Sequence, residues 1–363
     1  YIMKKTFFIC TILVCIFTNI RAQWKPVGNR IVTPWTEKVD VTSVLPEYPR
    51  PIMERNEWKN LNGLWEYAIT DVGKSCPKQF DGQILVPFAV ESALSGVGKA
   101  VGKEKELWYC RTFNIPSSWK NKKILLHFGA VDWKADVWVN GIKVGNHTGG
   151  FTPFSFDITA ALVAKGDNQL MVKVWDPTDD GYQPRGKQVK NPGGIYYTPV
   201  TGIWQTVWLE PVSSKYISNV VSVADIDNKN LKVKVGTQNT TSSDVVQIVL
   251  KEQNTIVAMT KGVVGETLEL ALADVKLWSP ESPFLYDLEV TLLDKGKKTD
   301  KVKSYAAMRK ISMHKDKDGI MRMQLNNKDC FQFGPLDQGW WPDGLYTAPT
   351  DEALAYDIEK TKD

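Results

Sequence analysis

The sequence predicts an all-β protein that begins with a jelly-roll β-sandwich and continues into an immunoglobulin-like β-sandwich. Three observations support this fold class: short runs in which side chains alternate between two faces, turn residues that separate those runs, and no convincing helical periodicity before about residue 350. A period of two lets each run bury one face against a neighbouring sheet. The elements are taken below in chain order.

The first sandwich is predicted over residues 23–212. The period of two is clear in Ile124–Phe128 and again in Ala135–Val139. Asn140-Gly141 separates the second run from Ile142–Val144, and this dipeptide tolerates the positive φ that both central positions of a two-residue hairpin turn require. Many short antiparallel strands over about 190 residues are typical of a jelly roll. Later strands are expected at Leu170–Val174 and Gln205–Leu209.

The second sandwich is predicted over residues 213–311. Pro211–Ser214 interrupts the first pattern, and from Tyr216 the strands become plainer and rich in Val, Lys and Thr. Several such runs with turn signals between them, over about 100 residues, suit an immunoglobulin-like sandwich. The expected strands are Leu231–Val235, Val245–Leu250, Thr267–Leu272 and Leu285–Leu293.

The last segment, residues 312–363, changes character. A turn at Gly319 and a polar hairpin around Asn326-Asn327 precede a predicted short strand at Cys330–Phe333. A helix follows, because Thr350 is a good N-cap and Leu354 and Ile358 recur four residues apart. One strand and one helix cannot close a domain, so we expect this segment to be truncated.

The N-terminus predicts a secretory signal peptide over residues 1–22. Lys4 and Lys5 precede an apolar run from Phe7 to Phe17, and small or polar residues follow up to Ala22. The run is shorter than the roughly 20 apolar residues that cross a membrane, so no membrane span is expected. We expect cleavage after Ala22 and a secreted or periplasmic product.

Charge and composition limit the partners and cofactors. Cleavage would remove three basic residues and no acidic one, so that 45 Lys and Arg become 42 against 41 Asp and Glu. A nearly neutral chain without a basic stripe argues against nucleic acid. The histidines lie far apart and lack metal-ligand spacing, so no metal or cofactor is expected. One disulfide is compatible with the remaining cysteines, Cys76, Cys110 and Cys330.

Five short motifs of the first sandwich and two of the second resemble glycoside hydrolase family 2, which includes β-galactosidases, β-glucuronidases and β-mannosidases. They occur in the family's order and at similar intervals over nearly all of the mature chain. The motifs are Leu61–Trp65, Val86–Phe88, Val137–Gly141, Gly150–Phe154, Thr201–Gln205, Leu277–Tyr286 and Met308–Ile311.

The resemblance implies that residues 312–363 begin a (β/α)8 TIM barrel. It also implies a retaining glycosidase, whose chemistry needs two carboxyl groups about 5 to 5.5 Å apart. In the family these are Glu residues after later barrel strands, so no catalytic residue is expected in this chain. The chain as given is accordingly expected to be inactive.

The first candidate substrate-binding loop is Asp176–Gln188, too rich in Gly, Pro and charge to be a strand. The resemblance places this loop near the barrel mouth, and an Asp in an Asp-Gly context there touches sugar hydroxyls, which points to Asp180. Arg185 could offer a planar donor fork to a ligand. The alternatives are a solvated turn for Asp180 and a structural salt bridge for Arg185.

The second candidate loop is Gly334–Gly344. The resemblance puts it at the carboxyl end of the first barrel strand, where barrel active sites are built. Asp337 and Gln338 could bind hydroxyls, and Trp340 or Trp341 could stack on a sugar face. Alternatively both Trp rings pack against the sandwiches. Gln332-Phe333-Gly334 stands where family members commonly have Leu-Arg-Gly, which leaves the Arg role unfilled.

Two functional interpretations follow. The first is the N-terminal portion of a secreted retaining β-glycosidase that acts on an oligosaccharide or polysaccharide, with β-galactosides favoured over β-glucuronides or β-mannosides. The second is a non-catalytic carbohydrate-binding or adhesive β-sandwich protein. The enzyme interpretation predicts that the loops around Asp180 and Asp337 lie on the same side of the molecule and face the barrel mouth.

Overall fold

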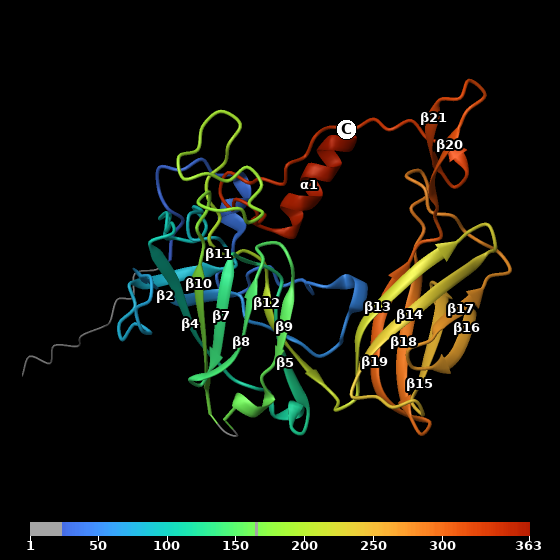
Figure 1. Cartoon of the computed structure of the whole chain (residues 1–363), viewed down its shortest axis with the longest axis horizontal. Coiled ribbons are helices and arrows are strands. Elements are labelled where there is room, and N and C mark those ends of the chain that lie inside the picture. The colour runs from blue at the N-terminus through green and yellow to red at the C-terminus, as the bar shows by residue number, and fades with distance from the viewer. Residues whose placement is uncertain (1–23, 164–165) are drawn as a thin grey trace, which may run out of the picture.

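The structure is a computed structural model that describes residues 24–163 and 166–363. It contains two β-sandwiches side by side, with a small three-stranded sheet and one helix from the C-terminal segment (Figure 1). The predicted all-β, two-sandwich architecture is therefore confirmed. The predicted signal peptide, residues 1–22, lies outside the described residues. None of the helices in the described ranges is long and apolar enough to cross a membrane.

The first sandwich packs a six-stranded sheet, in the order β3-β2-β4-β10-β7-β8, against a four-stranded sheet, β1-β12-β5-β9. Strands β6 and β11 form a separate antiparallel pair. The strands are β1 (Lys59–Asn60), β2 (Gly63–Asp71), β3 (Gly82–Val86), β4 (Lys105–Phe113), β5 (Lys123–Phe128), β6 (Val131–Asp132), β7 (Lys134–Val139), β8 (Ile142–Thr148), β9 (Phe154–Asp157), β10 (Asn168–Trp175), β11 (Gly202–Ile203) and β12 (Val207–Val212).

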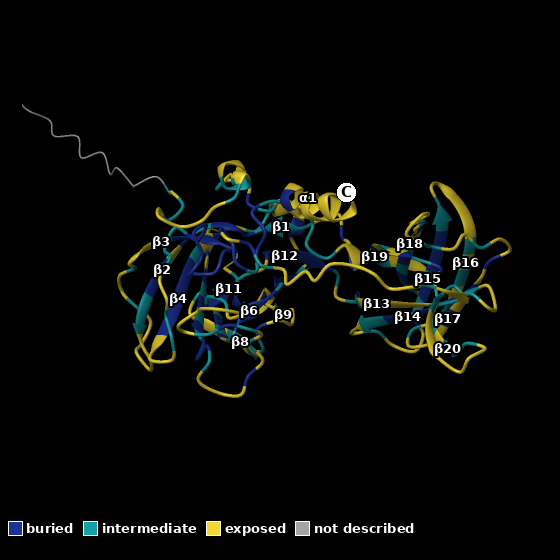
Figure 2. Cartoon of the chain, turned by 90° about the horizontal axis from the view of Figure 1, so that it is seen from above, coloured by how far each residue is buried: buried dark blue, intermediate teal, exposed yellow. Residues whose placement is uncertain are grey.

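The core of this sandwich follows the predicted alternation. On β10, Leu170, Val172 and Val174 are fully buried, while the residues between them are less buried or exposed. The turn between β7 and β8 is formed by Asn140 and Gly141, with φ of 51° and 78°. Both values are positive, as the Asn-Gly dipeptide predicts. Buried residues gather inside both sandwiches (Figure 2).

The second sandwich packs a three-stranded sheet, β13-β14-β17, against a four-stranded sheet, β16-β15-β18-β19. Its core is aliphatic, with Ile248, Leu250, Leu288 and Val290 almost completely buried. The strands are β13 (Tyr216–Asp225), β14 (Asn230–Gln238), β15 (Val245–Glu252), β16 (Thr255–Val263), β17 (Thr267–Ala271), β18 (Tyr286–Asp294) and β19 (Lys297–Ala306).

The C-terminal segment differs from its prediction at one element. It forms β20 (Ile311–Lys315), β21 (Met321–Leu325) and β22 (Lys328–Asp329), but residues 330–340 have no regular structure, so the strand predicted at Cys330–Phe333 is wrong. The apolar pattern alone is not enough, because a strand also needs a neighbour for its backbone groups. Phe331 and Phe333 accordingly stay 90% and 95% exposed.

The C-terminal helix forms as predicted. It is α1 (Asp351–Lys362), and the Thr350 hydroxyl accepts a hydrogen bond from the Ala353 amide at 3.1 Å. Only Ala353 is buried, whereas Leu354 and Ile358 remain 47% and 70% exposed. The segment therefore shows a capped helix without a barrel strand, and its assignment to a barrel stays a prediction.

Residues 48–55 strap the two sandwiches together. Met53 packs into the core of the second sandwich, and Glu54 pairs with Lys303 of β19 through two backbone hydrogen bonds of 2.8 and 3.0 Å. Ser304 donates a further bond of 2.6 Å to the Ile52 carbonyl. The strap therefore adds a short extended pairing to one edge of the second sandwich.

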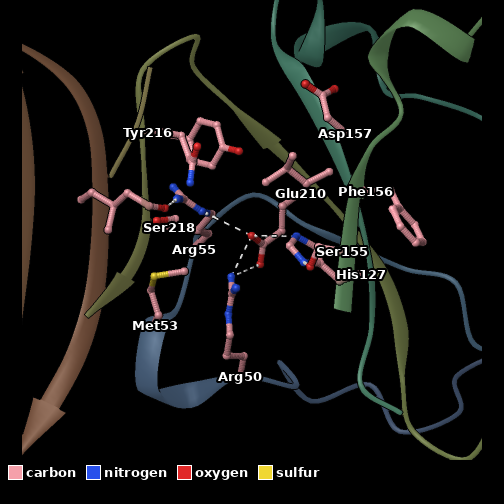
Figure 3. A pocket seen from close by; sticks show the side chains of 13 residues that line it. Arg50, Met53, Arg55, His127, Ser155, Phe156, Asp157, Glu210, Tyr216 and Ser218 are labelled. Atoms are coloured by element: carbon pink, nitrogen blue, oxygen red, sulfur yellow. Dashed lines mark hydrogen bonds and ion pairs between the residues drawn. The ribbon is translucent and has the colours of Figure 1, made fainter. Parts of the chain in front are cut away.

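Glu210 of β12 is the charged centre of this junction and lines a cavity of about 160 Å³ between the sandwiches (Figure 3). Its carboxylate accepts hydrogen bonds from Arg50 at 2.8 and 2.9 Å and lies 3.3 Å from the Arg55 guanidinium. Arg55 also pairs with Asp300 of β19. The strap thus connects a buried anion of each sandwich through arginine. Glu210 has further polar neighbours, namely Tyr48, His127 and Trp208.

Candidate functional site

Two loops meet at the end of the first sandwich. We define loop A as residues 176–201, between β10 and β11, and loop B as residues 330–350, between β22 and α1. The ring of Tyr197 in loop A stacks on Trp340 in loop B, with 4.5 Å between centroids and 18° between planes. Tyr346 of loop B approaches Gly186 of loop A so closely that a Cβ there would lie 3.0 Å from its hydroxyl. The two loops therefore lie on the same side of the molecule, as predicted.

An aromatic cluster joins these loops to the sandwich. Tyr346 contacts Trp340 edge-on at 5.0 Å and lies 5.2 Å from Trp204, which follows β11. Phe151 approaches both Tyr346 and Trp204, at 5.8 and 6.0 Å. The Trp204 indole also donates a hydrogen bond of 2.7 Å to the Gly150 carbonyl. Because rings from four separate chain segments interlock, the loop junction has a defined shape.

Asp180 lies at the surface of loop A between two lysines. Its carboxylate is 3.3 Å from the Lys103 ammonium and forms a short ion pair with Lys190. Hydrogen bonds from Lys190 and Lys103 hold the pKa of Asp180 below its usual range. The group is therefore ionised at neutral pH, and its remaining lone pairs can accept hydroxyl hydrogen bonds.

Arg185 serves the loop itself. Its guanidinium is partly buried and donates a hydrogen bond of 3.4 Å to the Asp179 carbonyl. The salt bridge that we gave as the alternative is not formed with any of the described residues. A role in ligand binding stays a prediction for this side chain.

The polar residues of loop B are open to solvent. Asp337 is exposed, and its carboxylate accepts a hydrogen bond of 2.7 Å from the Gly339 amide, which closes a tight turn. Gln338 is exposed beside it. Both are exposed and lie close before Trp340 in the chain, and their predicted hydroxyl-binding role stays a prediction.

The two tryptophans of loop B have different surroundings. Trp340 is partly exposed and lies between loops A and B, where it stacks on Tyr197. Trp341 is only 7% exposed and packs edge-on against Trp35, with the two centroids 6.3 Å apart, and in a small cluster with Ala353 of α1. The structure therefore favours the packing alternative for Trp341, whereas Trp340 is partly exposed at the loop junction and its contact with a sugar stays a prediction.

Loop B is anchored to the first sandwich by a buried acid. Asp343 is fully buried, and its Oδ2 accepts hydrogen bonds from the Thr33 amide and hydroxyl and from the Thr36 hydroxyl, at 2.9, 2.6 and 2.7 Å. The Thr347 hydroxyl adds a bond of 2.6 Å to the Trp204 carbonyl. These contacts fix the second half of loop B, whereas Asp337 and Gln338 extend beyond them.

Buried carboxyl groups support loop A from below, and the sequence analysis missed them. Asp176 accepts hydrogen bonds from the Thr178 amide at 2.8 Å and the Thr201 hydroxyl at 2.9 Å, which ties the two ends of the loop together. Asp132 accepts one of 3.3 Å from Gln188, whose own side-chain oxygen accepts a bond of 2.6 Å from the Val200 amide. The loop is therefore closed around polar anchors.

Glu91 is the third of these acids. It is 3% exposed and accepts a hydrogen bond of 2.9 Å from the Thr201 amide. Burial raises its pKa to about 8, although the bonds from Thr201 act in the opposite direction. Burial likewise raises the pKa of Asp132 and Asp176, which repel each other when both are charged. These acids are structural groups, and burial disfavours their charged forms.

A signal for the missed acids does exist in the sequence. Glu91 is the only charge between Val86 and Leu94, and Asp132 follows the apolar pair Ala130-Val131. A single carboxylate in an apolar run indicates a buried acid that needs hydrogen-bond donors. The donors themselves, such as the Thr201 amide, come from distant segments and could not be found this way.

The fold and the loop junction together define a tandem β-sandwich module whose connecting loops build a polar and aromatic surface at one end. The chain belongs to glycoside hydrolase family 2. The model of its sugar binding domain matches residues 83–209, and the model described as glycosyl hydrolases family 2 matches residues 209–309.

Individual relatives agree with this family. A β-glucuronidase of Paenibacillus borealis is 26% identical over 266 residues, which cover 68% of this chain and 44% of that protein. A β-galactosidase of Thermoanaerobacter pseudethanolicus is 24% identical over 317 residues, covering 82% of this chain and 42% of that protein. The chain thus spans less than half the length of these relatives.

A solved structure shares the fold. The β-glucuronidase of Ruminococcus gnavus in complex with D-glucaro-d-lactam superimposes with a TM-score of 0.70 at 20% sequence identity. The match covers 88% of this chain and 56% of that protein. The arrangement of the two sandwiches is therefore one that a β-glucuronidase also adopts.

Proposed function

We propose that this chain supplies the two N-terminal sandwich domains of a secreted, retaining β-glycosidase. The observation that supports the proposal is the contact between loops A and B through Tyr197 and Trp340; Asp180 belongs to the first of these loops and Asp337 to the second. The family of the chain and the names of its relatives support the reaction class.

In this proposal the loops bind and orient the sugar, while the chemistry occurs elsewhere. Retaining hydrolysis needs one carboxyl group as nucleophile and a second as acid and base, about 5 to 5.5 Å apart. Those groups belong to a barrel domain in the proposed enzyme. Asp180 and Asp337 would accept hydrogen bonds from sugar hydroxyls, and Trp340 would lie against an apolar ring face.

The surface chemistry of the loops favours a neutral sugar. Asp180 and Asp337 are both acidic, and the two lysines beside Asp180 are already paired with it. A uronate carboxylate beside Asp180 or Asp337 would be repelled by these acids, whereas a neutral sugar presents only hydroxyl groups to them. We therefore favour β-galactosides over β-glucuronides as substrates, although relatives of both names occur.

The test compares the 363-residue chain with the longer protein that is encoded when the reading frame is extended past Asp363. A complete barrel would need some 250 residues in all. Nitrophenyl β-galactoside, β-glucuronide and β-mannoside are offered to both. We expect no release by the shorter chain, and fastest hydrolysis of the β-galactoside, with a β-configured first product by NMR, from the longer one.

Each part of the proposal has its own contrary result. A preference for the glucuronide overturns the sugar assignment, and an α-configured first product overturns the retaining mechanism. Turnover by the 363-residue chain that disappears when one of its acids is replaced would show that the catalytic groups lie within it.

A further inference from the structure

We propose a second carbohydrate-binding site, a groove on the outward face of the six-stranded sheet that accepts one neutral pyranose unit of a glycan. This groove is separate from the junction of loops A and B. It encloses about 280 Å³ and is lined by Val72, Glu106, Lys134, Asp136, Lys173 and Trp175. We name it the sheet groove.

Strand register shows how the sheet groove is built. Trp175 of β10 lies beside Lys134 of β7 in the antiparallel register. One step of two residues along β10, Lys173 lies between Trp108 of β4 and Asp136 of β7. Residues two apart on a strand share a face, so all of these side chains project outward, opposite the buried alternate residues. The alternation that fills the core also builds the groove.

The lining combines an aromatic wall with charged hydrogen-bonding groups. The Trp175 indole donates a hydrogen bond of 2.8 Å to the Lys103 carbonyl, which fixes the orientation of its ring, and Trp133 lies behind it at 6.3 Å. The ring is only partly covered. A held aromatic ring beside polar groups is what a sugar needs, because a pyranose has an apolar face and a hydroxylated edge.

Ion pairs form the polar part of the lining. Lys173 bonds to Glu106 at 2.9 Å and lies 3.7 Å from Asp136, so its charge is shared between two carboxylates. Asp136 is also bonded to Lys143 at 2.6 Å, so each carboxylate of the lining is paired with a lysine. Carboxylate acceptors and ammonium donors can both bond hydroxyl groups. The groove therefore offers acceptors and donors to the hydroxyl groups of a neutral sugar unit.

Size and position limit the occupant further. A volume of 280 Å³ lies just below the roughly 300 to 1,000 Å³ of pockets that hold drug-sized ligands, so one ring fits and an oligosaccharide would extend beyond it. Trp175 is the last residue of β10, and Asp176 begins loop A. A glycan held in the sheet groove can thus lead towards the loop junction.

The experiment titrates the 363-residue chain, labelled with ¹⁵N at its tryptophan indoles, with four neutral trisaccharides: β-1,4-linked galactotriose, cellotriose, mannotriose and xylotriose. Trigalacturonic acid serves as the charged comparison. We expect at least one neutral trisaccharide to shift the Trp175 indole resonance with a dissociation constant below about 10 mM, and the acid to bind no more tightly.

Two variants locate the site. Trp175→Ala should weaken binding at least tenfold, and Lys134→Ala should weaken it several-fold while leaving the fold unchanged, since this lysine is exposed. The matched control is Trp138→Ala, which removes a tryptophan of the same sheet face that stacks on Trp108 outside the groove, at 5.7 Å. Trp138→Ala should bind within twofold of the unaltered chain.

Three outcomes would overturn the proposal: no shift with any neutral trisaccharide, tighter binding of the acid, or equal affinity in Lys134→Ala and the unaltered chain. None of them bears on hydrolysis. A negative binding result therefore does not contradict the proposed glycosidase function. A negative hydrolysis result likewise does not contradict binding in the sheet groove.

Discussion

Replacing Glu210 with Gln tests whether the charged strap holds the sandwiches together. The Glu210 side chain is 1% exposed and is paired with Arg50 and Arg55, whose side chains are 25% and 6% exposed. Removing one partner from a buried ion pair typically costs about 3 to 5 kcal/mol, because the other charge stays buried. Arg55 keeps Asp300 and Arg50 is partly hydrated, so we expect the lower end, about 3 kcal/mol.

The stabilisation by Glu210 should also depend on pH in a defined direction. Burial alone would raise the pKa of Glu210, but the adjacent His127 ring, the charge of Arg50 and the hydrogen bond from Tyr48 together hold it well below its usual range. A lowered carboxyl pKa contributes stability above the unfolded pKa, near 4.5, and loses it as the pH falls. The difference in the free energy of unfolding between the unaltered chain and Glu210→Gln should therefore become smaller below about pH 4.5.

Urea denaturation at pH 7 and at pH 3.5, followed by circular dichroism and fluorescence, measures the free energy of unfolding in both chains. Glu57→Gln is the matched control, because Glu57 is exposed, and it should change stability by no more than about 0.5 kcal/mol. A Glu210→Gln chain within about 1 kcal/mol of the unaltered one at pH 7 would refute a stabilising role for this network.

Two further stability predictions follow from single groups. Glu91→Gln removes an acid whose pKa burial raises to about 8, and such an acid stabilises the fold below about pH 4.5 and loses that contribution as the pH rises through 8. Between pH 4.5 and pH 7 the free energy of unfolding, measured by urea denaturation, should therefore fall by about 3 kcal/mol more in the unaltered chain than in the variant. An equal pH dependence in both chains would contradict this. Thr350→Ala removes the side-chain cap of α1. Amide hydrogen exchange in residues 351–362 should therefore accelerate by the equivalent of about 1 kcal/mol. Unchanged exchange there would show that the cap does not stabilise the helix.

Sequence periodicity was enough for the sandwiches and failed where pairing partners decide the outcome. The strands of β7 and β10 follow the alternation because each has two neighbours in the sheet. Cys330–Phe333 has a similar apolar content, but its backbone pairing in the described structure ends at the bond from the Cys330 amide to the Met323 carbonyl of β21, and the segment stays irregular. The Asn140-Gly141 turn was predictable because its cause lies within the dipeptide itself.

The site was predictable at the level of loops and less so for single residues. The motif resemblance predicted loops A and B as candidate binding loops. The pairing of Asp180 with Lys103, however, depends on a segment far away in the chain. The contact of Trp341 with Trp35 likewise joins distant segments. Nothing in the sequence near loops A and B indicates Lys103 or Trp35 as a partner. Sequence alone therefore could not distinguish Trp340, at the loop junction, from Trp341, which is buried against Trp35.

The most direct test of the account is the effect of Asp180→Ala and Asp337→Ala on kcat/KM of the enzyme encoded by the extended reading frame. A hydrogen bond to a charged group is worth about 1.5 to 3 kcal/mol, so each change should lower kcat/KM for the preferred nitrophenyl glycoside by about 10- to 100-fold. Asp318→Ala, in the exposed turn between β20 and β21, is the control and should leave kcat/KM within twofold. If both loop variants match that control, the junction of loops A and B does not bind the substrate and the central claim fails.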